Sequence, residues 1–284
     1  MTGNILSKKQ KACLQHWMLV IGILIVALIY IYPVLLMVMN SLKSFKEVLT
    51  NVLALPSALA FENFTYVIEK MDYSHLFLNN LAITAIGIVG IVAISSIAAY
   101  ILDRRRTRYT KLLYILIITP MLIPFQTIMI TLLKTMSTIG LSGSTWGLGI
   151  QYWGFGVPMA VFIFYNFMKT VPHEIDESAL IDGAATFRAF RSIIFPLLQP
   201  VTATVIVLDV MWIWNDFLLP LLMVNGTPVT RTLVLAAYNF VGQLNTKWHY
   251  ALAAMVLAIL PSVIFFIFLQ RYIIEGVVAG SIKG

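Results

Sequence analysis

Six long apolar runs limit what this chain of 284 residues can fold into. They occupy residues 17–39, 76–102, 112–133, 145–168, 201–224 and 251–269. A helix needs about 20 apolar residues to cross a membrane, because each residue rises about 1.5 Å through a core about 30 Å thick. The runs lack the alternation of a membrane barrel, and a helix satisfies its own backbone in lipid. The sequence therefore predicts an all-α membrane protein with six transmembrane helices.

The composition agrees with a membrane protein and argues against a nucleic-acid partner. Charged residues make up only 11% of the chain, whereas a soluble globular chain has about 25%. The net charge of +7 comes from short basic clusters between the apolar runs. Such clusters are typical of cytoplasmic loops in membrane proteins. We therefore expect the chain to lie in a lipid membrane and to have no nucleic-acid partner.

The basic clusters also predict the orientation. The amino tail, the second and fourth connections and the carboxy-terminal tail hold about 13 of the 19 Lys and Arg residues. These segments, and with them both termini, are expected to be cytoplasmic. Residues 1–70 would then comprise a cytoplasmic tail, the first transmembrane helix and the first outer loop. Residues 71–270 would form a five-helix core, and residues 271–284 a cytoplasmic tail.

Several kinds of site are not expected on this chain. Its one cysteine, Cys13, excludes an internal disulfide, and its four histidines show no pair at ligand spacing, so no metal site is predicted. No Gly-x-x-x-x-Gly-Lys-Ser/Thr loop occurs, so ATP would have to bind another polypeptide. We predict no catalytic residue and no cofactor bound by this chain. The first apolar run is too long for a signal peptide and is expected to remain as a helix.

Proline, glycine and aromatic residues mark local features of the predicted helices. Prolines that are expected to kink them are Pro33, Pro120, Pro124, Pro158, Pro220 and Pro261. Small surfaces that allow close helix approach are expected at Gly87 and Gly90, and at Gly143 and Gly147. Trp146, Tyr152 and Trp153 are expected to lie in an aromatic belt at the outer membrane interface.

The connection at residues 169–196 has the signals of two short helices. Pro172 suits a first helical turn. Three acidic residues that complement a helix dipole follow it: Glu174, Asp176 and Glu177. Gly183 is placed to end this helix in a left-handed conformation, and Thr186 to cap a second helix. A helix this short cannot bury its apolar side alone, so the rest of the chain, a partner or the membrane surface must cover it.

This connection resembles the EAA loop of binding-protein-dependent ABC importer permeases. The matching residues are Glu177-Ser178-Ala179, Asp182-Gly183-Ala184 and Pro196, with serine at position 178 where alanine is usual. Residues 61–64 (Phe-Glu-Asn-Phe), 79–81 (Asn-Asn-Leu), 214–217 (Trp-Asn-Asp-Phe) and the ending at 271–284 look like the maltose-type carbohydrate branch. The chain therefore resembles the smaller permease subunit of a maltose-type importer.

The resemblance implies a type I ABC importer permease fold in the plasma (inner) membrane of a prokaryote. The implied coupling residues, seated in a cytoplasmic ATPase, are Glu177, Ser178, Ala179, Asp182, Gly183, Ala184 and Arg188. The implied partners are a second, non-identical permease subunit, two subunits that bind ATP and Mg, and an extracellular solute-binding protein. The outer loops at residues 40–75 and 225–250 are the expected docking surface for the binding protein.

Polar residues inside the fifth apolar run predict a substrate pathway. Asp209 and Asp216 fall at membrane depth, where carboxylates normally face a bundle interior or a water cavity. Aromatic faces and hydrogen-bonding groups that a sugar needs are combined in Trp212, Trp214, Asn215 and Asp216. The alternative is a polar contact between helices.

The sequence features favour an importer of carbohydrate, with an oligosaccharide as its substrate. Three other functions remain as alternatives. Permeases of importers for non-sugar solutes share the coupling loop, so this loop alone does not identify sugar. A self-contained secondary carrier often has inverted repeats, and no clear repeat occurs here. A nonconducting membrane anchor would show no transport defect when Asp216 or Trp214 is changed.

Overall fold

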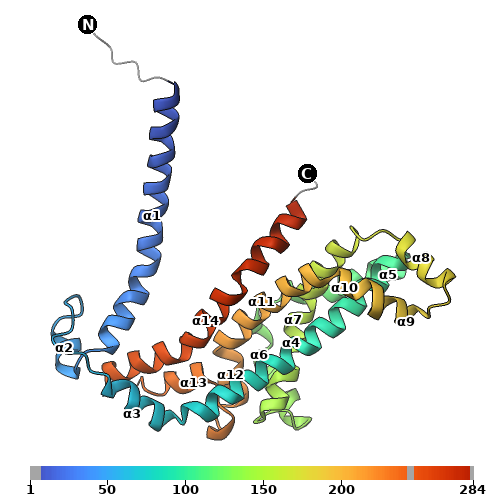
Figure 1. The fold of residues 1–284 in the computed structure, drawn as a ribbon. Helices are drawn as coiled ribbons and strands as arrows, with labels where there is room; N and C mark the ends of the chain where they lie inside the picture. Colours follow the sequence, from blue (N-terminus) through green and yellow to red (C-terminus); the bar gives the residue numbers. More distant parts are fainter. Residues whose placement is uncertain (1–7, 242–245, 282–284) are drawn as a thin grey trace. The chain divides into compact units, whose positions relative to one another are not determined.

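The computed structural model describes residues 8–241 and 246–281, with side chains described for residues 13–241 and 246–270. Its longer helices are α1 (Lys8–Ser41), α3 (Glu62–Met71), α4 (Tyr73–Arg104), α5 (Arg108–Ile118), α6 (Phe125–Thr138), α7 (Thr145–Met168), α8 (Glu174–Ile181), α11 (Gln199–Asn215) and α14 (Trp248–Ser281) (Figure 1). Its short ones are α2 (Phe45–Thr50), η1 (Thr119–Leu122), α9 (Thr186–Ala189), η2 (Phe190–Ile194), α10 (Phe195–Leu197), α12 (Leu218–Met223), η3 (Pro228–Thr230) and α13 (Leu233–Tyr238). The side chains of the amino-terminal lysines and of residues 271–284, on which part of the orientation rests, lie outside the described ones.

Four of the six predicted spans are confirmed as long apolar helices. They are Cys13–Ser41, Tyr73–Arg104, Thr145–Met168 and Trp248–Gln270. The other two runs overlap bent helix pairs, which are Arg108–Leu122 with Phe125–Thr138 at 102° and Thr186–Leu197 with Gln199–Asn215 at 75°. The fifth run overlaps only the second helix of the latter pair. The described chain therefore has four continuous candidate spans, or up to six if each bent pair counts as one.

The continuous helices predicted for the third and fifth runs are wrong in their middle parts. In the third run, Ile123 is extended because the next residue is Pro124, which disfavours helical geometry before it. In the fifth run, α11 ends at Asn215, and Asp216 has the extended backbone of a break before α12. Pro33, Pro158 and Pro261 lie inside continuous helices instead.

The chain divides into two compact units. The first unit comprises Met1–Val67 and Phe240–Val256, and the second comprises Ile68–Asn239 and Leu257–Gly284. Each unit is held together by its own hydrogen bonds and packing contacts. The second unit contains both candidate sites that the sequence indicated.

In the first unit, buried side chains of lysine and asparagine hold the loop that follows α1. The Lys43 side chain is buried, and its Nζ donates to Asn40 Oδ1 at 2.9 Å and to the Asn51 carbonyl at 3.0 Å. Asn63, from the Phe-Glu-Asn-Phe motif, donates from Nδ2 to the carbonyls of Ser41 and Lys43, both at 2.9 Å. The motif asparagine thus satisfies backbone acceptors at the end of α1.

The carboxylate of Glu47 closes the same loop from its exposed side. It accepts hydrogen bonds from the hydroxyl and backbone N–H of Ser57 and from those of Ser44, which form a capping box at the start of α2. The bonds from Ser57, and then those from Ser44, lower the pKa of Glu47 to about 2. The carboxylate therefore stays ionised, and able to accept all four bonds, at neutral pH.

In the second unit, α4 and α7 form the principal helix pair, and α11 packs on both (Figure 1). The indole of Trp153 lies over Gly90 and donates from Nε1 to the Ile86 carbonyl at 2.9 Å. The expected close approach at Gly87 and Gly90 is confirmed, because a Cβ at Gly87 would lie 2.8 Å from Ile213 Cδ1. Gly147 instead lies against the backbone of Leu141 in its own preceding turn.

The aromatic belt predicted around Tyr152 and Trp153 is wrong for these two residues. Tyr152 is fully buried, and Trp153 is packed into the α4–α7 contact. Trp146 alone of the three is largely exposed, at 70%. Residues 146 and 153 lie about two turns apart on nearly the same face of α7. The difference therefore comes from their position along the helix, because Trp146 is in the first turn and Trp153 lies against Gly90 of α4.

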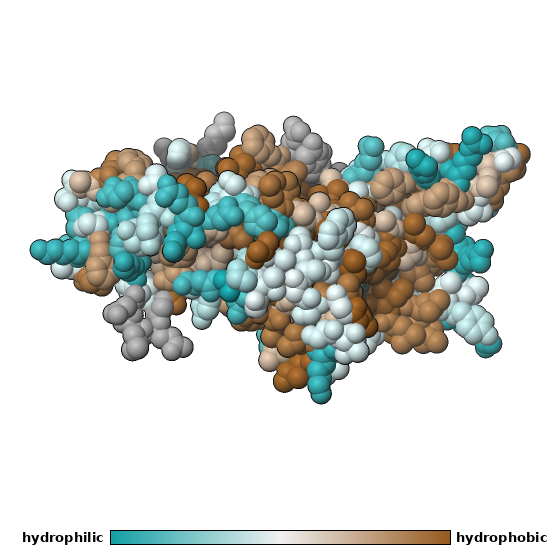
Figure 2. All heavy atoms as spheres, turned by 90° about the horizontal axis from the view of Figure 1, so that it is seen from below, coloured by the Kyte–Doolittle hydropathy of each residue, from teal (hydrophilic) through white to brown (hydrophobic). Residues whose placement is uncertain are grey.

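Large apolar side chains remain on the surface of both units. Apolar areas take up much of the face seen in Figure 2. In α1, no residue of the most apolar 18-residue stretch is buried. Ile23, Leu28 and Ile29 are each more than 60% exposed. Exposure of this extent fits a chain whose solvent is lipid.

We expect a Gly90→Ala substitution to lower the thermal stability of the detergent-solubilised chain. The added methyl would overlap the Trp153 indole, and overpacking of this kind costs about 1–3 kcal/mol. Gly154→Ala, on α7, is the matched control because a Cβ there meets nothing within 4 Å. Equal melting temperatures for the two variants would contradict this account of the helix pair.

Candidate coupling loop and substrate pathway

Helix α8 ends as the sequence predicted. Gly183 has φ +81°, its N–H donates to the Leu180 carbonyl at 3.0 Å, and the Ala184 N–H reaches the Ala179 carbonyl at 3.0 Å. These two bonds form a Schellman motif, which needs the left-handed residue that glycine supplies. The start of the next helix differs from expectation, since Ala185 precedes α9 and Thr186 is its first residue without a capping bond.

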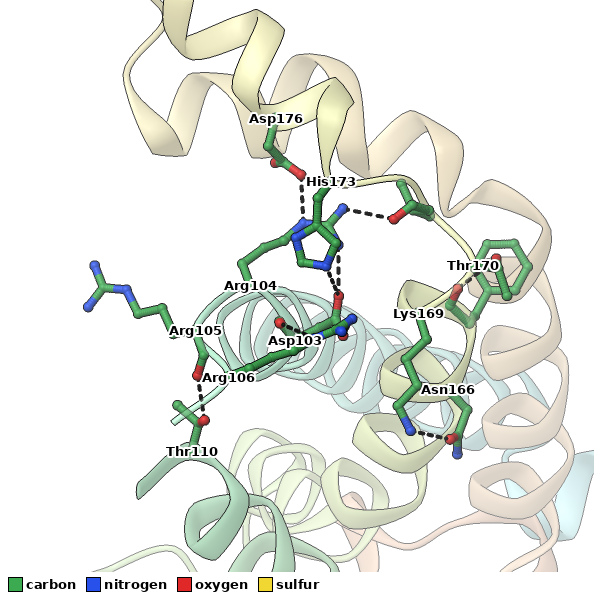
Figure 3. A network of polar contacts seen from close by, with 12 residues as sticks. Asp103, Arg104, Arg105, Arg106, Thr110, Asn166, Lys169, Thr170, His173 and Asp176 are labelled. Atoms are coloured by element: carbon green, nitrogen blue, oxygen red, sulfur yellow. Dashed lines mark hydrogen bonds and ion pairs between the residues drawn. The ribbon is translucent and has the colours of Figure 1, made fainter. Parts of the chain in front are cut away.

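The inner side of α8 is fastened to the end of α4 by Asp176. Its Oδ1 accepts from the Tyr100 hydroxyl at 2.8 Å, and its Oδ2 accepts from Arg104 Nε at 2.6 Å. Asp176 is buried, and the side chain of Arg104 is only 10% exposed. Figure 3 shows the side chains of Asp176 and Arg104 joining the loop to the last turn of α4.

Further polar contacts hold Arg104 in this position. Its Nη1 lies 2.7 Å from Asp103 Oδ2, and its Nη2 donates to the Val171 carbonyl at 3.3 Å. Asp103 also pairs with Arg106 at 3.0 Å and lies 3.6 Å from His173 Nε2 (Figure 3). One guanidinium thus joins α4, the residues before α8, and α8 itself.

The outer side of α8 and α9 is exposed and mixes apolar with acidic residues. Ile181 is 85% exposed, Phe187 65% and Leu180 52%, while Ile175 packs on the core. Among the implied coupling residues, Glu177, Ser178, Asp182, Gly183 and Arg188 are exposed, Ala184 is half-buried and Ala179 is buried. The Ser178 hydroxyl donates to the Glu174 carbonyl at 2.8 Å, so serine at this position is satisfied within α8.

The chain returns from the loop through a wide turn. Residues Phe190–Ile194 form one π-helical turn between α9 and α10. Phe190 is buried, with its ring 5.1 Å from that of Tyr100. The same tyrosine thus contacts both arms of the loop, through Asp176 and through Phe190.

Of the four residues predicted for the substrate pathway, Trp214 is enclosed by this chain. Its indole is fully buried, donates to the Ala258 carbonyl at 3.2 Å, and meets the rings of Phe77 and Phe265 edge-on. The ring therefore offers no free face in this structure. Asn215 donates to the Met211 carbonyl at 2.8 Å and accepts from the Ser262 hydroxyl at 3.1 Å.

The break after α11 is stabilised by the Asn-Asn-Leu motif of α4. Asn80 is buried, donates to the Trp214 carbonyl at 3.3 Å, and accepts from the Leu233 N–H at 2.8 Å. Asp216 Oδ1 accepts from the Leu218 N–H at 3.2 Å. Side chains thus satisfy backbone groups that a continuous helix would have paired.

Trp212 and Asp216 lie together with Tyr152 beside two cavities. The Tyr152 hydroxyl donates to Asp216 Oδ2 at 2.9 Å, and the Trp212 ring meets the Tyr152 ring edge-on at 5.3 Å. A cavity of about 540 Å³ between α6, α7 and α11 and a smaller one of about 210 Å³ share Phe125, Phe155 and Trp212 as lining. The smaller cavity also reaches Asp216.

The larger cavity has one polar amide on its mostly apolar wall. Gln151 is 5% exposed, and its Nε2 donates to the Leu141 carbonyl at 3.3 Å. Its Oε1 has no hydrogen-bond partner within the described part of the chain. Aromatic walls with a few directed polar groups are typical of small-molecule sites.

Sequence reasoning missed the residues that support both sites. In the sequence, Tyr100 lies within the second apolar run, and Asp103 and Arg104 begin the basic cluster that follows it. Neither setting indicates a contact with α8. Phe125, Phe155 and Gln151 gave no local signal, since each is ordinary for a membrane helix. Asp103 carried the clearest signal, because a carboxylate beside several arginines predicts an ion-pair network.

Comparisons with known proteins identify the family of the chain. Residues 90–278 match the family described as "Binding-protein-dependent transport system inner membrane component". The Probable starch degradation products transport system permease protein AmyC of Thermoanaerobacterium thermosulfurigenes is 38% identical, over 96% of this chain and 99% of that protein. The Melibiose/raffinose/stachyose import permease protein MelC of Bacillus subtilis is 32% identical, over 92% of this chain and 94% of that protein.

A solved structure supports the fold independently. A chain in the crystal structure of a bacterial ABC transporter involved in the import of the acidic polysaccharide alginate matches with a TM-score of 0.77. The match covers 95% of this chain and 99% of that chain at 20% identity. The resemblance to carbohydrate ABC importer permeases, which the EAA-like loop and the maltose-type motifs together indicated, is confirmed by these relatives. The chain belongs to the family of inner membrane components of binding-protein-dependent transport systems.

Proposed function

We propose that this chain is the transmembrane pathway subunit of an ATP-driven carbohydrate importer, coupled to a separate ATPase through α8. The observation that carries the proposal is the two-sided character of α8. Its inner side is pinned to α4 by Asp176, while its outer side exposes Leu180 and Ile181. Exposed aliphatic side chains beside acidic ones suit a protein partner better than water.

The mechanism follows from the stiffness of this connection. A subunit that grips the outer side of α8 and moves would pull on Asp176, and the Arg104 and Tyr100 contacts would pass that motion to α4. Because α4 is packed along most of α7, the pair would move as one body and rock the cavity between inward and outward openings. The ATPase would supply ATP and Mg binding, and this chain would act as no enzyme.

The remaining partners and the orientation belong to the same proposal. A second permease subunit would complete the pathway, and an extracellular solute-binding protein would dock on the outer loops. Both termini would be cytoplasmic, since this orientation puts the α8–α9 loop on the side of the ATPase. Relatives named for starch degradation products and for melibiose, raffinose and stachyose support an oligosaccharide as substrate.

The substrate pathway would run past the cavities lined by Trp212, Phe125 and Phe155. Trp212 is 40% exposed, and its ring would stack against a sugar ring. Gln151 Oε1 would accept a sugar hydroxyl. Trp214 and Asn215 would support this wall from behind.

The coupling role of the outer side is tested by Ile181→Asp. The residue is 85% exposed, so its change leaves folding intact while placing a charge in the proposed interface. We expect the amount of ATP-hydrolysing subunit that co-purifies with the tagged chain to fall about tenfold or more, as for an interface anchor. Ile181→Leu is the control and should retain the subunit. Retention of the ATPase by Ile181→Asp would favour a helix that lies on the membrane surface.

The anchoring role of the inner side is tested by Asp176→Asn. Loss of one partner of a buried ion pair leaves Arg104 poorly compensated, so α8 should loosen from α4. In proteoliposomes we expect ATP hydrolysis to persist while transport per ATP hydrolysed falls about tenfold. Glu174→Gln removes a charge from an exposed position of the same helix and should transport normally. Tight coupling in Asp176→Asn would refute transmission through this contact.

The two tryptophans should respond differently to substitution by alanine. Trp212→Ala removes a cavity wall and should raise the KM of saccharide transport several-fold with the melting temperature nearly unchanged. Trp214→Ala empties a fully buried site and should destabilise the chain by about 3–5 kcal/mol. Unchanged transport kinetics in Trp212→Ala would remove Trp212 from the pathway. Kinetics with a non-sugar solute as the preferred substrate would overturn the carbohydrate assignment.

A further inference from the structure

A third cavity in the same unit is lined by positively charged side chains. It has a volume of about 550 Å³ and lies between the start of α5 and the end of α7. Four cations line it, together with two tyrosines: Arg106, Arg108, Lys111, Lys169, Tyr114 and Tyr165. No carboxylate is among its described lining residues.

Three of the four cations lack an acidic partner. Arg106 pairs with Asp103 at 3.0 Å, whereas no carboxylate lies within ion-pair distance of Arg108, Lys111 or Lys169 among the described side chains. Lys169 Nζ contacts only neutral groups, at 3.2 Å from Asn166 Oδ1 and 4.3 Å from the Tyr165 ring centre (Figure 3). Within the described part of the chain, the Arg108 guanidinium makes its hydrogen bond and its cation–π contact with the neighbouring Tyr109.

Converging like charges around one cavity is unfavourable unless an anion neutralises them. Lys and Arg side chains around a hollow are the usual means of binding a phosphate group. A free phosphate and the headgroup of a lipid share this chemistry, so the surroundings of the cavity must decide between them.

The surroundings favour a lipid. The cavity wall includes the first turns of α5, which begin the bent candidate span Arg108–Leu122. Immediately beyond it, Leu112, Leu113 and Leu116 are between 51% and 57% exposed. A phosphate held by the cations would therefore have an apolar helix face beside it, which suits acyl chains and offers nothing to a free ion.

We propose that this cavity binds the phosphate headgroup of an anionic membrane lipid. Arg108, Lys111 and Lys169 would hold the phosphate, and the exposed leucines of α5 would contact the acyl chains. A bound lipid at this position would brace the bent pair α5–α6 against the end of α7. The inference is independent of which solute the chain transports.

The test is a lipid titration of the full-length chain in a nonionic detergent, read by native mass spectrometry. The probes are short-chain phosphatidylglycerol, short-chain phosphatidylcholine and inorganic phosphate as a competitor. We expect phosphatidylglycerol to bind preferentially, and Lys111→Gln or Lys169→Gln to weaken its binding about fivefold each. Lys169→Arg keeps the charge and should keep the binding.

Arg105→Gln is the matched control. Arg105 belongs to the same basic cluster and is exposed, but it does not line the cavity and its side chain points away from the network in Figure 3. Its variant should bind phosphatidylglycerol like the native chain. Equal binding of the two lipids, equal weakening by Arg105→Gln, or unchanged binding in both glutamine variants would each overturn the proposal.

Two further outcomes would reassign the cavity. Displacement of the lipid by inorganic phosphate at similar concentration would show a free-phosphate site and overturn the lipid. Loss of a co-purifying ATPase in Lys111→Gln or Lys169→Gln, with lipid binding intact, would show that the cations face a protein and would equally overturn it.

Discussion

The close contact between α4 and α7 is the feature on which the second unit depends. In lipid there is little hydrophobic gain from joining two apolar helices, so association relies on tight packing and on hydrogen bonds. The missing side chain at Gly90 supplies the packing, and the Trp153 bond to the Ile86 carbonyl supplies a directed contact. The loop at residues 169–196 is bonded to the end of α4 through Arg104 and Asp176, and the cavity of about 540 Å³ lies against α7. Both candidate sites therefore inherit their geometry from this pair.

The Arg104–Asp176 contact fixes the geometry of the loop more than it stabilises the fold. A buried ion pair gains little net stability, because removing both charges from water costs about as much as their attraction returns. What the pair does offer is a single geometry, since the guanidinium binds Asp176, Asp103 and the Val171 carbonyl at once. In the proposed mechanism, a loop fixed in this way would transmit displacement instead of absorbing it. The Schellman motif at Gly183 has the same consequence at the far end of α8, where it sets the direction in which the chain leaves the helix.

Local signals predicted most of the spans and the end of α8, and they gave little sign of the contacts that support the two candidate sites. Apolar length gave the spans, and the left-handed glycine gave the end of α8, because each depends on a few neighbouring residues. The bend near Pro124 and the break at Asp216 interrupt runs whose overall hydropathy is that of a continuous span, and the bend at Leu198 lies just before the fifth run. Tyr152 and Trp153 were misassigned because their partners are a helix break about 60 residues later and a backbone carbonyl of α4. Contacts between residues so distant in sequence leave no local pattern.

The break at Asp216 changes how that carboxylate should be interpreted. Both of its oxygens are used inside the chain, one by the Leu218 N–H and one by the Tyr152 hydroxyl. The two bonds give Asp216 a structural role at the broken helix, and the remaining acceptor positions of its carboxylate stay open, since a carboxylate has about four. Gln151 and Trp212 line the cavity of about 540 Å³, Gln151 with a buried Oε1 that has no partner within the described part of the chain and Trp212 with 40% of its surface exposed. In the proposed pathway, an amide and an aromatic face would therefore act beside Asp216, which also holds the wall on which they lie.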